Sequence, residues 1–270
     1  MSTTVSTSFV TLYDAEVKAA YQREQSYLGS LLRVRPVSNA NIVTFQRLGT
    51  ASTATKGRHA DIVTSDIVHT NTTVTLSDYY SGEYVDALDE LKTNVALRAE
   101  YARTIAAALQ RRKDSIIATA WSTGATDFAD TDGALSKSRV LAVRQQLLEN
   151  DVPMGNIFGV ITPASHTALM AEDTFTSSDY TGLRQFDSSA QTFNWLGIQF
   201  VVFNGLPAAS GSYKWAFFGD KNASGLGVGA EPQLMVNYVP EKDSTLIAGK
   251  LSMGATVIDP RGIYRLEVTD

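Results

Sequence analysis

Two runs of β-branched residues, joined by a long polar connection, constrain how this 270-residue chain can fold. Residues 41–48 and residues 67–76 have the composition of strands. Residues 49–66 between them are rich in Gly, Ala and Thr, and such a connection is too long for an ordinary turn in a compact domain. Because an isolated hairpin is only marginally stable in water, we expect this one to project from the body and to need a partner surface.

A long amphipathic helix is the clearest element of the sequence. Asn94 is its predicted N-cap, and the helix is expected to run from Val95 to about Ala120, which at 1.5 Å per residue gives a length of roughly 40 Å. Its apolar stripe is formed by Leu97, Tyr101, Ile105, Leu109, Ile116 and Ala120. A helix of this length is expected to serve as a spine.

The densest basic cluster, Arg111, Arg112 and Lys113, lies on this helix. Two interpretations have comparable weight. Cations near a helix C-terminus complement the helix dipole, and the same cluster could form a basic stripe that faces a polyanion.

The other elements predict an α+β protein. Before the hairpin, residues 11–32 have the cap and the apolar spacing of an amphipathic helix. A short helical piece is expected at residues 86–91, a helix from Ser136 to Asn150 and another from Pro163 to Met170. Strands, mostly antiparallel late in the chain, are expected at residues 157–161, 198–203, 214–218, 233–239, 246–258 and 263–268.

Composition excludes several classes of protein. A hydrophobic share of 44% excludes overall disorder, and the absence of cysteine excludes disulfides and thiolate metal sites. A net charge of −5 argues against a dedicated nucleic-acid binder, although a protein that encloses nucleic acid needs no basic excess. No apolar run approaches the length of a membrane helix, and the N-terminus lacks the basic and apolar regions of a secretory signal, so we expect a soluble protein made in the cytosol.

No motif predicts an enzyme. The three histidines, His59, His69 and His166, have no metal-ligand spacing, and no G-x-S-x-G motif occurs. Residues 225–230 (GLGVGA) lack the third glycine of a dinucleotide fingerprint, and we interpret their glycines as turn or bulge residues. We therefore expect no catalytic residue, no cofactor and no metal site.

The order of these elements, together with four local sequences, resembles the major capsid proteins of tailed double-stranded DNA bacteriophages, which have the Hong Kong 97-type fold. Residues 82–91 (GEYVDALDEL) leading into residues 106–114 (AAALQRRKD) are similar to the family's spine helix. The other similar stretches are VITP at residues 160–163, GIQFV at 197–201 followed by Leu206-Pro207, and GATVI at 254–258 before GIY at 262–264.

The resemblance implies a division of the chain into four parts. Residues 1–33 would form an N-terminal arm and residues 34–75 the extended loop. Residues 76–124 with 230–252 would form the peripheral domain, which includes the spine helix. Residues 125–229 with 253–270 would form the axial domain.

The resemblance also implies the contacts that the subunit makes. The extended loop would lie on an adjacent subunit, with Arg47, Lys56, Arg58 and His59 as contact residues. The peripheral loop, formed by Pro240, Glu241, Lys242 and Asp243, would meet its equivalents at three-fold positions. Arg111, Arg112 and Lys113 would then be an inner-surface basic stripe.

The implied function is a structural shell protein with no enzymatic activity, which self-assembles through pentamers and hexamers around phage DNA. The implied partners are a separate scaffolding protein and a portal, and the binding of a decoration protein is left open. The implied location is the virion capsid, with assembly in the host bacterial cytoplasm and no membrane involved.

Two alternatives stay open at this point. An encapsulin-type protein compartment would have the same fold and a similar length. A soluble α+β ligand-binding domain or enzyme would instead form a compact monomer or small oligomer with a polar-lined pocket. The exposed hairpin argues against this second alternative, because an uncovered hairpin promotes aggregation.

Overall fold

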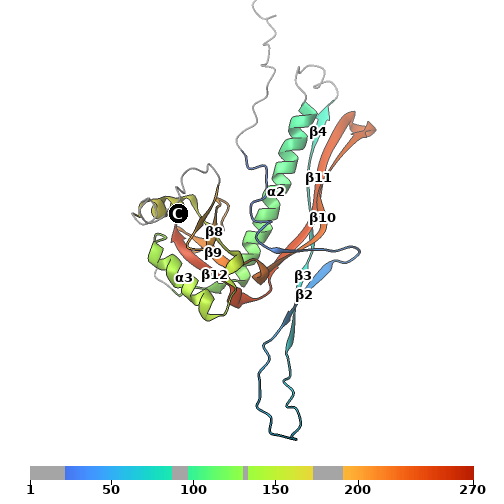
Figure 1. Cartoon of the computed structure of the whole chain (residues 1–270). Coiled ribbons are helices and arrows are strands. Elements are labelled where there is room, and N and C mark those ends of the chain that lie inside the picture. Colours follow the sequence, from blue (N-terminus) through green and yellow to red (C-terminus); the bar gives the residue numbers. More distant parts are fainter. Residues whose placement is uncertain (1–21, 87–96, 130–132, 173–190) are drawn as a thin grey trace, which may run out of the picture. The chain divides into compact units, whose positions relative to one another are not determined.

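The computed structural model describes residues 22–86, 97–129, 133–172 and 191–270 (Figure 1). The chain divides into two compact units, and each is described by itself. Within the described residues, the first unit contains residues 22–25, 78–86, 97–112 and 230–251. The second unit contains residues 26–77, 113–129, 133–172, 191–229 and 252–270.

In the first unit, helix α2 (Leu97–Gly124) packs on strands β4 (Ser77–Asp86) and β11 (Ser244–Val257). The contact is made by Val85, Ile105 and Ile247, all of which are buried. A Cβ at Gly249 would lie only 2.7 Å from Leu109 Cδ1, so a glycine at this position allows the helix to approach the strand closely. The predicted spine helix is confirmed and extends to Gly124, whereas its predicted cap lies outside the described residues.

A four-stranded sheet has the order β1-β10-β11-β4. Strand β10 (Ser224–Val239) continues through the 3-10 turn η5 (Pro240–Lys242) into β11. Strand β1 (Arg33–Pro36) pairs in parallel with Gly225–Val228 of β10.

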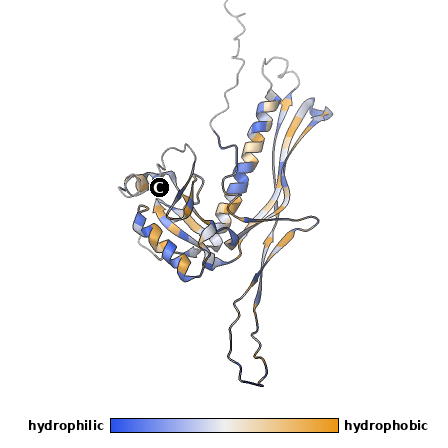
Figure 2. Cartoon of the chain, in the orientation of Figure 1, coloured by the Kyte–Doolittle hydropathy of each residue, from blue (hydrophilic) through white to orange (hydrophobic). Residues whose placement is uncertain are grey.

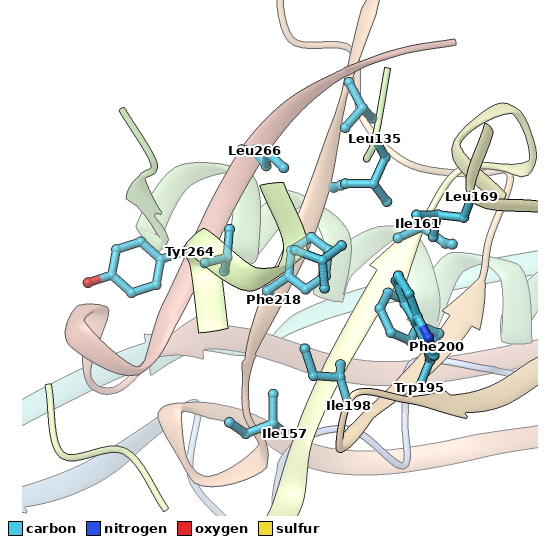
Figure 3. Close-up of a cluster of buried hydrophobic side chains, with 14 of the residues drawn as sticks. Leu135, Ile157, Ile161, Leu169, Trp195, Ile198, Phe200, Phe218, Tyr264 and Leu266 are labelled. Carbon is cyan, nitrogen blue, oxygen red and sulfur yellow. The ribbon is translucent and has the colours of Figure 1, made fainter. Parts of the chain in front are cut away.

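The second unit contains a six-stranded sheet with the order β5-β12-β9-β6-β8-β7. Two helices, α3 (Lys137–Glu149) and α4 (Pro163–Met170), contribute apolar side chains to its core (Figure 3). Among the described residues, fifteen buried ones form this core, Phe200 and Phe218 among them. The strands are β5 (Thr126–Asp127), β6 (Ile157–Ile161), β7 (Thr192–Trp195), β8 (Ile198–Val202), β9 (Tyr213–Asp220) and β12 (Ile263–Thr269). The 3-10 turns are η2 (Met154–Asn156), η4 (Lys221–Ala223) and η6 (Pro260–Gly262).

The helix boundaries in the second unit follow from capping. Ser136 Oγ accepts a hydrogen bond from the Arg139 N–H at 3.5 Å, and Asn150 is the C-cap of α3. Thr162 Oγ1 accepts one from the Ser165 N–H at 3.1 Å, and Pro163 follows in the first turn of α4. Both predicted helices are confirmed, and Figure 2 shows α3 with alternating hydrophilic and hydrophobic residues.

The predicted hairpin is also confirmed. Strand β2 (Ile42–Leu48) pairs with β3 (His69–Thr75) in antiparallel register, from Ile42 opposite Thr75 to Leu48 opposite His69. Beyond Leu48 the two sides of the hairpin continue without a regular ladder. The hairpin therefore has a paired base and a long unpaired end.

Two other helices were expected, at residues 11–32 and at residues 86–91, and the structure confirms neither of them. Residues 22–32 contain no helix, so the predicted N-terminal helix is wrong over this stretch, and residues 11–21 lie outside the described residues. A short helix was expected at residues 86–91. Asp86 is instead the last residue of strand β4, and residues 87–91 lie outside the described part of the chain.

Candidate inter-subunit surfaces

The base of the hairpin rests on a strip of glycines. Val43 and Phe45 are each 2% exposed. A Cβ at Gly225 would lie 2.6 Å from the Phe45 ring, and a Cβ at Gly227 would lie 2.7 Å from Val43 Cγ2. Alternate residues of a strand share one face, so glycine at every second position leaves a flat surface for these side chains.

This packing corrects one interpretation of the sequence. The glycines of residues 225–230 are not turn residues, because they lie inside β10, where Gly225 and Gly227 are in unbroken register with β1. Glycine is required here for close packing, since the Phe45 ring occupies the space that a Cβ of residue 225 would need.

An ion pair also joins the base of the hairpin to the segment around η6. Arg47 Nη1 lies 2.7 Å from Asp259 Oδ1, and Arg261 Nη2 donates to Asp259 Oδ2 at 3.1 Å. Asp259 therefore connects β2 to η6 through two guanidinium groups. Arg47, expected at an inter-subunit contact, has a partner within its own chain, and its role between subunits stays a prediction.

We expect acid to weaken this connection. Burial raises the pKa of Asp259, but hydrogen bonds from Arg261 and the charges of Arg47 and Arg261 outweigh burial, so the pKa is lower than usual. The carboxylate therefore stabilises the folded chain above the ordinary pKa of about 4, and this contribution is lost as the pH falls through the lower folded value. Asp259→Asn should cost about 1 kcal/mol at neutral pH and less below pH ~4.

Urea unfolding of the unassembled chain, followed by circular dichroism at several pH values, measures this effect. Asp66→Asn, at an exposed carboxylate of the hairpin, is the matched control and should leave the free energy of unfolding unchanged. If Asp259→Asn lowers the free energy of unfolding by the same amount in acid and at neutral pH, the charge of Asp259 is not the cause of the loss.

The outer part of the hairpin is uncovered in the single chain. Lys56, Arg58 and His59 are exposed, and His59 adopts the left-handed conformation, with φ 69°, in the turn that joins the two sides. Four apolar side chains are also exposed, namely Ile62 (77%), Val63 (65%), Ile67 (41%) and Val68 (67%). This density of exposed β-branched residues is typical of a surface that another molecule covers.

The peripheral loop is ordered by its own side chains. Asp243 has a φ of 44°, and its Oδ1 atom accepts a hydrogen bond from the Tyr238 hydroxyl at 2.6 Å, which raises the pKa of Tyr238. Lys242 Nζ lies 3.9 Å from the centre of the Tyr84 ring. Pro240 and Glu241 are exposed at the loop surface. The loop therefore presents a fixed conformation, and its contact at a three-fold axis stays a prediction.

The basic cluster of α2 has partners within the chain. Arg111 Nη1 donates to Gln22 Oε1 at 2.8 Å, and the Arg112 guanidinium lies 4.3 Å from the centre of the Tyr79 ring. A Cβ at Gly29 would lie 2.9 Å from Lys113 Cε. These contacts give the cluster a structural role, while its exposure to a polyanion stays a prediction.

Sequence reasoning missed the carboxylate that follows this cluster. Asp114 is fully buried and accepts hydrogen bonds from Ser26 Oγ at 2.6 Å, from the Leu28 N–H at 3.2 Å and from the Tyr27 N–H at 3.3 Å. A single carboxylate thus holds an irregular segment against α2. An acidic residue within the helix next to three basic residues was the available signal, but its partners lie almost 90 positions away.

A cavity of about 500 Å³ lies in the second unit, beside the base of the hairpin. Arg33, Arg47, Arg261 and Asp220 are among its lining residues, which include no histidine, cysteine or serine. In the part of the chain that the structure describes, no cluster of three His, Asp or Glu residues is suited to a metal ion. No helix among the described residues has the length and hydropathy needed to cross a bilayer.

A family model described as phage capsid protein matches residues 5–270 of the chain. No curated protein sequence matches. Among solved structures, the capsid of cyanophage P-SCSP1u is similar with a TM-score of 0.81 and 17% identity, covering 100% of this chain and 96% of that chain. Mycobacterium phage Che8 gives a TM-score of 0.76 and 18% identity, with 95% and 96% covered. The capsid of Ralstonia phage GP4 gives 0.72 and 11%, with 97% and 95% covered.

The solved structures establish the fold, and the family model establishes membership over nearly the whole length. The Hong Kong 97-type fold predicted from the sequence is therefore confirmed. The chain belongs to the phage capsid protein family and is a structural protein of the virion shell.

Proposed function

We propose that this chain is the major capsid subunit of a tailed phage, and that it assembles through pentamers and hexamers into an icosahedral shell that encloses genomic DNA. The observation that carries the proposal is the hairpin. Its base is buried on the subunit through Val43 and Phe45, whereas its outer end carries exposed apolar residues that water disfavours. A neighbouring subunit would cover that end.

The four-part division of the subunit is part of the proposal. Residues 1–33 act as the N-terminal arm, residues 34–75 as the extended loop, residues 76–124 with 230–252 as the peripheral domain, and the remaining residues as the axial domain. Lys56, Arg58 and His59 contact the adjacent subunit, and the peripheral loop meets its equivalents. Many modest interfaces on a closed shell reinforce one another through multivalency.

The partners follow from the same proposal. A scaffolding protein directs assembly in the host bacterial cytoplasm, and a portal occupies one vertex, while the binding of a decoration protein is left open. The shell encloses DNA without binding it tightly, which a net charge of −5 favours. We assign no enzymatic activity to the chain, and the family match does not favour the encapsulin or the soluble ligand-binding alternative.

Particle size is the measurement that tests this function. The chain is expressed with and without its neighbouring genes and is examined by light scattering and negative-stain microscopy. We expect shells, or pentamers and hexamers that close when the scaffolding protein is added. A monodisperse monomer under both conditions would overturn the proposal.

A further inference from the structure

The turn after strand β8 contains Asn204 followed by Gly205, and no other asparagine of the chain precedes a glycine. Both residues are exposed and lie outside the strands of the six-stranded sheet. Within the described part of the chain, neither the Gly205 N–H nor the Asn204 side-chain amide takes part in a hydrogen bond. The backbone nitrogen of residue 205 and the side-chain carbonyl of residue 204 are therefore available to react with each other.

Packing favours glycine at position 205. A Cβ at Gly205 would lie 2.8 Å from Phe203 Cζ, and the Phe203 side chain is only 2% exposed. The Phe203 N–H also donates to the Ile161 carbonyl at 2.9 Å, which ties this residue to the end of strand β6. A larger residue at position 205 would have to displace the buried Phe203 ring, so the fold maintains a glycine directly after Asn204.

An asparagine followed by glycine is chemically labile. Asparagine is already among the thermally labile residue types, because the backbone nitrogen of the next residue can attack its side-chain carbonyl carbon. A Cβ on that next residue hinders the attack, whereas glycine has no Cβ and has wide conformational freedom. An exposed turn without backbone hydrogen bonds also opens locally at a low cost in free energy, which allows the two groups to meet.

We propose that Asn204 is a site of spontaneous modification, at which the side-chain amide is converted to aspartate and isoaspartate. The Gly205 nitrogen bonds to Asn204 Cγ, the Cγ–Nδ2 bond breaks, and the amide group leaves as ammonia with the proton of the Gly205 N–H. Water then adds to one of the two carbonyl carbons of the cyclic imide and opens the ring. Opening at the side-chain carbonyl gives aspartate, and opening at the main-chain carbonyl gives isoaspartate.

Each conversion changes the charge and the backbone of the turn. A neutral amide becomes a carboxylate, which adds one negative charge to the net charge of −5. The isoaspartate product also inserts a methylene group into the main chain, two residues before Leu206, which is buried. The reaction needs only water and the folded chain, so the inference does not depend on the proposed capsid function.

Peptide mapping of the aged, unaltered protein is the first test. The folded chain is stored at physiological temperature and pH and is then digested in heavy-oxygen water, which labels any conversion that occurs after unfolding. The peptide with Asn204 should gain about one dalton without the label and should separate into an aspartate and an isoaspartate form. Asn39 is also exposed but precedes Ala40, so its conversion should be at least about 10-fold slower.

Two variants identify the reacting group. Asn204→Gln keeps a neutral amide but places it one carbon farther from the backbone nitrogen, so conversion at this position should be at least about 10-fold slower. Asn204→Asp carries the added charge from the start. It should elute from an anion-exchange column together with the modified fraction of the aged natural protein.

Three results would overturn the proposal. If Asn204 stays unmodified in the folded protein while the same peptide converts after digestion, the fold prevents the reaction. If aspartate forms without isoaspartate, the amide is hydrolysed directly and Gly205 takes no part. If Asn39 converts as fast as Asn204, the glycine gives no selectivity, and the turn after β8 is not a distinct site.

Discussion

A chain that lacks residues 49–60 is expected to fold normally and to form no shells. The deletion removes the turn with Lys56, Arg58 and His59, but it retains the β2–β3 ladder and the buried Val43 and Phe45. No residue of the deleted stretch is buried, so the free energy of unfolding should change by less than about 0.5 kcal/mol. Circular dichroism and urea unfolding test the fold, and electron microscopy with the scaffolding protein present tests assembly.

A replacement of equal length separates the reach of the hairpin from its chemistry. Residues 49–60 are exchanged for a Gly/Ser sequence of 12 residues, which keeps the chain long enough but removes the cations and the ordered turn. We expect assembly at least about tenfold less efficient than that of the natural chain, with some shells retained. Normal shell yield from the deletion itself would contradict the assignment of residues 34–75 as the extended loop.

Elements with a strong local pattern could be predicted from the sequence. Helix α2 was found because its apolar residues recur at helical spacing over more than 20 positions. The hairpin was found because β-branched residues cluster on both sides of a polar connection, and α3 was found through Ser136 and the periodicity that follows. In each case neighbouring residues in the sequence carry the whole signal.

Elements that depend on distant residues were misjudged. The glycines at 225 and 227 have the local appearance of a turn, and their role follows only from hairpin side chains about 180 positions earlier. The segment 22–32 has apolar spacing suited to a helix, yet Leu28 and Leu31 are buried in an irregular conformation that Asp114 supports. Tertiary hydrogen bonds and packing outweighed local propensity at both places.

The candidate contact surfaces, too, could be predicted only where neighbouring residues in the sequence carry the signal. Sequence and resemblance together indicated the hairpin and the peripheral loop as surfaces, and the outer part of the hairpin and the peripheral loop are exposed in the structure. They gave no indication that Asp259 pairs with Arg47, since an ion pair between distant residues leaves no periodic trace in the sequence.

Truncating Trp121 is expected to cause a large loss of stability. Its side chain is fully buried near the end of α2, and its ring centre lies 5.1 Å from that of Phe158 and 5.6 Å from that of Phe217. Trp121→Ala removes these contacts and leaves a cavity, so the free energy of unfolding should fall by about 3–5 kcal/mol. Urea unfolding followed by circular dichroism measures the change.

Two further variants identify the cause of that loss. Tyr80→Ala truncates an aromatic side chain that is 75% exposed and should cost less than about 0.5 kcal/mol. Trp121→Phe keeps an aromatic ring against Phe158 and removes an indole N–H that has no hydrogen-bond partner among the described residues, so it should cost much less than Trp121→Ala. Equal losses from Phe and Ala would mean that the full size of the indole matters more than aromatic stacking. A Trp121→Ala chain as stable as the natural one would contradict the packing of α2 in the second unit.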